Sequence, residues 1–75
     1  MAQRRYLIVI EGGADANYSA YAPDLAGCVA TGSTREECER EMRAAIAFHL
    51  EGLRDAGEAI PKPSDVTATH VDVSA

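Results

Sequence analysis

Tryptophan is absent from this sequence of 75 residues, phenylalanine occurs once and cysteine twice. It also lacks the run of about 20 apolar residues that a membrane-spanning helix needs, so we expect no such span. The apolar run after Arg4 and Arg5 covers only residues 6–10 and is too short for the core of a signal peptide. We therefore expect one small domain, residues 1–75, located in the cytoplasm.

Basic residues are in the minority, since 7 Lys and Arg stand against 12 Asp and Glu and give a net charge of −5. They are scattered along the chain and form no basic patch in the sequence. The phosphate backbone of a nucleic acid would repel such a domain, so we expect no direct DNA binding. An acidic domain is better suited to a basic protein partner.

Motifs for metals and cofactors are missing as well. The side chains that could bind a soft metal are Cys28, Cys38, His49 and His70. Their spacing is not that of a zinc site, and a stable disulfide is not expected in the cytoplasm. We interpret Cys28 and Cys38 as small buried side chains, and His49 as a packed histidine rather than a general base or ligand.

The carboxylates form no obvious catalytic set. Glu11 and Asp24 end the first and second predicted strands, and these ends lie opposite each other in an antiparallel pair. Asp72 could approach Glu11 if the last strand runs parallel to the first, but metal-dependent phosphoryl chemistry uses several converging carboxylates. We expect no enzyme, no catalytic residue, no cofactor and no metal. A minimal metal-dependent nuclease that uses Glu11, Asp24 or Asp72 is the less favoured alternative.

Three strands are predicted before the helix. Residues 5–11 are apolar on both faces, and residues 28–31 form a short third strand. The second strand, residues 17–22, places Tyr18, Ala20 and Ala22 on one face and Ser19 and Tyr21 on the other. The short connections predict an antiparallel meander. Pro23 marks the turn between the last two strands, where we expect the Asp24 carboxylate to bind backbone amides.

A helix and a last strand complete the predicted order. Thr34 and Glu37 form a capping box that predicts a helix over residues 35–56, which ends at Gly57. The prolines after it predict an extended connection, and residues 66–73 are typical of a final strand. A strand–helix–strand crossover places that strand parallel to a neighbour. The predicted fold is α+β with the order βββαβ: an antiparallel three-stranded meander, one long helix, and a final strand parallel to the first.

Several apolar positions predict which surfaces are buried and which are exposed. The helix repeats apolar residues along one face at Cys38, Met42, Ala45, Ile46, His49, Leu50 and Leu53. Phe48 lies on the opposite, charged side, where it either marks a contact surface or packs under the C-terminal segment. One helix covers only one face of a sheet, so Leu7, Val9 and Val29 are expected to be exposed without a partner.

The sequence resembles the HicB-like antitoxin family, including its short stand-alone members, from Tyr6 to Asp72. The resemblance rests on the strand 6–10, the turn Tyr-Ala-Pro-Asp-Leu-Ala-Gly-Cys at 21–28, the Gly-Ser-Thr cap at 32–34, and residues 45–53 and 57–63. Ala26 stands where the family often has proline. The family's fold is a degraded ribonuclease-H-like domain that has lost most of its catalytic carboxylates.

The resemblance implies an antitoxin-type module that binds a small basic ribonuclease toxin (HicA-like) and neutralises it by covering its catalytic histidine. Members usually carry a C-terminal DNA-binding domain, and the sequence from 1 to 75 includes none. The candidate contacts, with a toxin or with a second copy in a homodimer or higher oligomer, are Tyr21, Asp24, Leu25 and Phe48. A solo homologue that only associates with itself remains the alternative.

Overall fold

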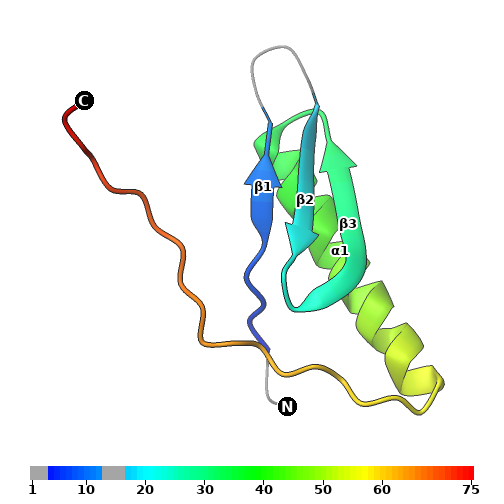
Figure 1. Ribbon diagram of the computed structural model, residues 1–75. Coiled ribbons are helices and arrows are strands. Elements are labelled where there is room, and N and C mark those ends of the chain that lie inside the picture. Colours follow the sequence, from blue (N-terminus) through cyan, green and yellow to red (C-terminus); the bar gives the residue numbers. More distant parts are fainter. Residues whose placement is uncertain (1–3, 13–16) are drawn as a thin grey trace.

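A computed structural model describes residues 4–12 and 17–75 of the chain. In chain order it contains the strands β1 (Val9–Glu11), β2 (Tyr18–Ala22) and β3 (Leu25–Gly32), followed by the helix α1 (Arg35–Asp55). The strands form an antiparallel sheet in the order β1-β2-β3, and α1 lies across one face of it (Figure 1). The predicted α+β class and the antiparallel meander are therefore confirmed.

The strand register separates an outer face of the sheet from a face that packs on the helix. Val9 pairs with Tyr21, and Tyr21 pairs with Val29, so these three side chains share the outer face. Ala20 lies on the opposite face, where its small side chain lets α1 approach the sheet closely.

Two predicted strand boundaries differ from the structure. β1 begins at Val9 rather than at residue 5, because β2 ends at Ala22 and offers no backbone partner further along. β3 begins at Leu25 rather than at residue 28, because Leu25 pairs with Ala22 directly after the two-residue turn. The register between β2 and β3 shifts between Tyr21 and Ala22, so β3 contains more residues at this point than β2. Gly27 lies in this irregularity and has a positive φ of 79°.

Local hydrogen bonds fix both ends of α1. At its start the Glu37 N–H donates to Thr34 Oγ1 at 3.0 Å, and Glu37 Oε1 accepts from the Ser33 N–H at 2.8 Å. Bonds from the backbone and side chain of Ser33 lower the pKa of Glu37. The predicted capping box is confirmed, although Glu37 reaches the residue before the N-cap.

The end of α1 is a Schellman motif. The Gly57 N–H donates to the Arg54 carbonyl at 3.1 Å, and the Glu58 N–H donates to the Leu53 carbonyl at 2.9 Å. Gly57 has a φ of 73°, a conformation that favours glycine. The predicted helix end is thus confirmed at Gly57.

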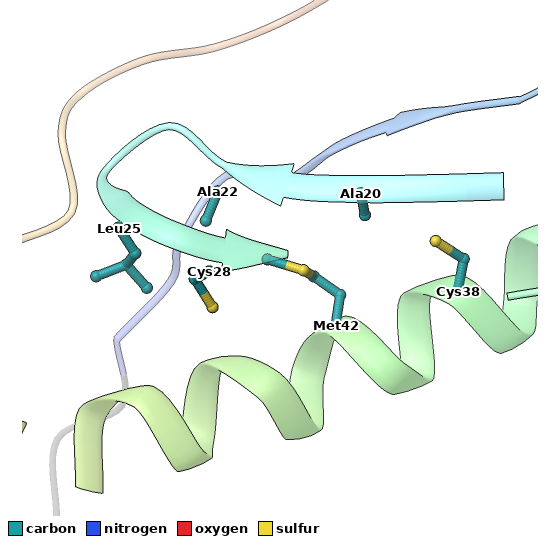
Figure 2. Close-up of a cluster of buried hydrophobic side chains, with 6 residues drawn as sticks. All are labelled: Ala20, Ala22, Leu25, Cys28, Cys38 and Met42. Atoms are coloured by element: carbon teal, nitrogen blue, oxygen red, sulfur yellow. The ribbon is translucent and has the colours of Figure 1, made fainter. Parts of the chain in front are cut away.

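The core lies between the sheet and the first half of α1. Its buried side chains are Ala20, Ala22, Leu25, Cys28, Cys38 and Met42 (Figure 2). Cys38 and Met42 point from the helix toward the strands, as the predicted apolar stripe requires. Both cysteines are buried and free, in agreement with their interpretation as small core side chains.

The predicted fourth strand is not formed. Residues 66–75 are exposed and have no strand partner, and they lead away from the sheet without joining it (Figure 1). The predicted strand–helix–strand crossover is therefore not completed, although the chain does pass from the end of α1 to the side of β1 (Figure 1). An open gap of about 720 Å³, bordered by residues 4–8 and 63–67, then separates the C-terminal segment from the chain that leads into β1.

Candidate protein-contact surface

The four predicted contact residues do not lie together. Tyr21 is 42 % exposed on the outer face of the sheet, and Phe48 is 79 % exposed on α1. Leu25 is only 1 % exposed and belongs to the core. It has no surface to offer a partner, because its early position in β3 places it under the turn, facing the helix (Figure 2).

Val29 links the two exposed aromatic side chains. It is the cross-strand neighbour of Tyr21, it is 64 % exposed, and it lines the same groove as Phe48. Val9 extends the row on the other side of Tyr21. We call Val9, Tyr21, Val29 and Phe48 the apolar band. The alternation of the strands indicated that Val29 is exposed, but no sequence signal placed it in the same groove as Phe48.

The groove at the end of the apolar band lies between β3 and the second half of α1. It measures about 490 Å³, and Val29, Phe48, His49 and Leu53 are among the residues that line it. Phe48 therefore does not pack under the C-terminal segment, which was one of its two interpretations. Cys28 also borders the groove, but burial raises the pKa of its thiol and so disfavours the reactive thiolate.

Asp24 holds the C-terminal segment and not its own turn. The Ser64 N–H donates to Asp24 Oδ2 at 3.0 Å, and the Ser64 hydroxyl donates to Oδ1. These two bonds lower the pKa of the Asp24 carboxyl below its ordinary value. The expectation that Asp24 binds amides of the turn is wrong, because a partner 40 residues away is in place.

A second contact fixes the same stretch of chain. The Tyr6 hydroxyl donates to the Pro61 carbonyl, so the connection after α1 is tied to the residues that precede β1. We call the pair of contacts, Asp24 with Ser64 and Tyr6 with Pro61, the C-terminal latch. Nothing in the sequence identified Ser64 or Tyr6 as latch residues, since each finds its partner only through the tertiary fold.

The acidic residues do not converge. Glu11 ends β1 at one end of the sheet, and the turn that carries Asp24 lies at the other end. Asp72 lies in the exposed C-terminal segment. Within residues 4–12 and 17–75, no group of three His, Cys, Asp or Glu side chains is placed to hold a metal ion. Nor does that part of the chain contain a helix of the length and apolarity needed to cross a membrane.

These features define a class: a small acidic α+β domain with one covered sheet face, and with exposed apolar side chains of the kind found at protein contacts. The chain matches the model of the HicB-like antitoxins of bacterial toxin–antitoxin systems over residues 6–73, and it belongs to that family.

Individual relatives are more distant in sequence. An uncharacterized 14.9 kDa protein of Haemophilus phage HP1 is 36 % identical over 61 residues, which are 81 % of this chain but 45 % of the phage protein. The chain thus spans about half the length of that relative. A UPF0150 protein of Synechocystis is 33 % identical over 76 % of this chain and 72 % of its own length. A UPF0150 protein of Thermoplasma acidophilum is 31 % identical over 77 % of this chain and 84 % of its own length. No solved structure matches the chain significantly.

Proposed function

We propose that this chain is an antitoxin-type binding module that sequesters and neutralises a small basic ribonuclease toxin of the HicA-like kind. The match to the HicB-like antitoxin family over residues 6–73 carries this proposal. The module acts by covering the toxin and masking its catalytic histidine. It performs no catalysis of its own, and it acts in the cytoplasm, where its free cysteines Cys28 and Cys38 stay reduced.

The apolar band supplies the contact surface for the toxin. Tyr21, Val29 and Phe48 are large enough to bury substantial apolar area once a partner covers them. The net charge of −5 attracts a basic protein and accelerates its association. Apolar contact then provides affinity, while the acidic surface selects partners of the opposite charge.

The domain itself has the ribonuclease-H-like order. In this proposal residues 1–75 form a single domain, and residues 66–73 form a fourth strand that runs parallel to a β1 strand along its free edge. The chain passes from the end of α1 to the side of β1, and the C-terminal latch holds it there, which supports a strand at this edge of a sheet. The scattered Glu11, Asp24 and Asp72 favour binding over nuclease activity.

A pull-down of the tagged chain from its native lysate, with mass spectrometry of the captured proteins, tests the proposal. We expect a small basic protein, and we expect the purified chain to inhibit RNA cleavage by that protein. Recovery of the chain alone, associated only with itself, would contradict neutralisation and favour a solo homologue.

Substitutions locate the contact surface. Phe48→Asp places a charge in the apolar band and should weaken toxin binding at least tenfold, as loss of an aromatic contact residue commonly does. Ala47→Asp is the matched control, because Ala47 is exposed on the same helix but does not line the groove. Equal effects of the two substitutions on toxin affinity would remove the apolar band from the proposal.

A further inference from the structure

We propose that residues 66–73 form their fourth strand on a second copy of this chain, so that two copies exchange their C-terminal segments along the free edges of β1. The inference rests on the fourth strand proposed above, but not on toxin neutralisation. It concerns whether the strand pairs with β1 of its own chain or with β1 of a second copy.

The accessible surface area first indicates that this segment lacks its partner. The chain exposes 6187 Å², whereas a folded protein of 8.0 kDa exposes about 4,450 Å². The excess is about 1,700 Å² for one chain and therefore about 3,500 Å² for two copies, which is within the range of about 2,000–5,000 Å² that obligate dimers bury in total. The radius of gyration of 14.3 Å likewise exceeds the value of about 11 Å expected for a compact chain of this length.

The C-terminal segment contributes to this surface. Residues 64–75 are all exposed, and Val66, Val71 and Val73 are 54 %, 79 % and 79 % exposed. Within residues 66–73, five of the eight residues are valine or threonine, which favour a pleated, half-buried strand. The segment therefore has the composition of a strand without the burial of one.

The edge that would receive it is available. The sheet order β1-β2-β3 leaves the outer backbone of β1 without a strand partner in the described part of the chain. Arg4 and Arg5 border the gap beside this edge, while residues 64–75 contain Asp65 and Asp72 but no Lys or Arg. Opposite charges thus favour an incoming C-terminal segment at this place.

The base of the segment directs it away from its own β1. The C-terminal latch fixes Pro61 and Ser64 against the body of the domain. Pro61 and Pro63 hold their own φ near −65° and keep the preceding residues extended, so the connection is stiff. From Ser64 the chain leaves across the open gap, with the sheet on its far side (Figure 1). A stiff hinge with an extended arm is the geometry that strand exchange requires.

The first experiment measures the mass of the full chain by size-exclusion chromatography with light scattering. We expect twice the 8.0 kDa of one chain. The double variant Val71→Asp with Val73→Asp should become a monomer, because it places charges on the exchanged strand. Its fold should persist by circular dichroism, since both positions are exposed. Phe48→Asp, the control on the apolar band, should remain a dimer.

A second measurement separates exchange from closure within one chain. Copies labelled with ¹⁵N and copies labelled with ¹³C are mixed, unfolded and refolded together. Exchange predicts nuclear Overhauser contacts between β1 amides of one copy and valine methyl groups of the other. A monomeric chain, contacts confined to one copy, or a dimer that survives the double valine substitution would overturn the inference. Since no toxin takes part, failure to find one leaves these results unaffected.

Discussion

Gly32 provides a sharp test of how closely α1 packs on the sheet. It ends β3, it is buried, and it directly precedes the capping residues of the helix. A Cβ atom at this position would lie 2.5 Å from the backbone nitrogen of Cys38 and 2.8 Å from its Cα. Both neighbours are backbone atoms, so no change of side-chain rotamer relieves the overlap in Gly32→Ala.

The cost follows from this geometry. Ordinary contacts of a Cβ atom lie at 3.4–4 Å, so the first turn of α1 must retreat by about 1 Å. That movement separates Cys38, whose thiol lies 4.0 Å from the Ala30 carbonyl, from the strand it packs on. Overpacking of this kind costs about 1–3 kcal/mol. At about 2 kcal/mol, the Tm of a domain of this size falls by about 8–16 °C.

Gly52→Ala is the matched control, with the opposite expected sign. No atom lies within 4 Å of a Cβ built on Gly52, which is exposed in the middle of the second half of α1. Replacing a glycine inside a helix by alanine stabilises it by about 1 kcal/mol. The same chemical change should therefore destabilise the protein at Gly32 and stabilise it at Gly52.

Urea unfolding followed by circular dichroism measures both free energies, at one protein concentration because association affects stability. If Gly32→Ala is too unstable to give a native baseline in the urea titration, Gly32 and Gly32→Ala are compared in chains that also carry the stabilising Gly52→Ala substitution. A Gly32→Ala variant as stable as the parent would refute the close packing of the helix start on β3.

Two further predictions concern local contacts. Thr34→Ala removes the bond to the Glu37 N–H and should lower the free energy of unfolding by about 1 kcal/mol, whereas Thr31→Ala, on an exposed strand position, should change it far less. Asp24 has a lowered folded pKa, so the latch contributes above the unfolded value of 3.8 and is lost as the pH falls through the folded pKa. The protection factor of the Ser64 amide, which is its hydrogen-exchange rate compared with that of an unstructured amide at the same pH, should fall on this acidification, and Asp24→Asn should remove this pH dependence of the protection factor. An amide that exchanges equally fast in the parent and in Asp24→Asn would contradict the latch.

The parts of the fold that the sequence predicted depend on contacts close in the chain. The capping box of Thr34 and Glu37 spans three residues, and the helix end at Gly57 depends on bonds to Leu53 and Arg54. The apolar stripe of α1 follows from helical periodicity, which requires no knowledge of the rest of the molecule. Such features follow from local physics, so the sequence was sufficient.

Strand boundaries and contact residues depended on distant neighbours. The sequence placed Leu25 in a turn, but its pairing with Ala22 makes it the first residue of β3, where it is buried. Alternation indicated an exposed Val29, yet only the packing of α1 on β3 placed it in the lining of the same groove as Phe48. The candidate contact surface was therefore predicted in part, through Tyr21 and Phe48.

By itself the sequence determined the family, the α+β class, the helix with both its ends, and the acidic charge, because each follows from local patterns or from summed composition. Only the tertiary structure decided that Asp24 holds Ser64, and that residues 66–73 remain without a strand partner in one chain. The physical reason is that a strand is stabilised by a backbone neighbour from elsewhere in the fold. A sequence shows that residues 66–73 suit a strand, but the free edge that receives them exists only after β1, β2 and β3 have assembled.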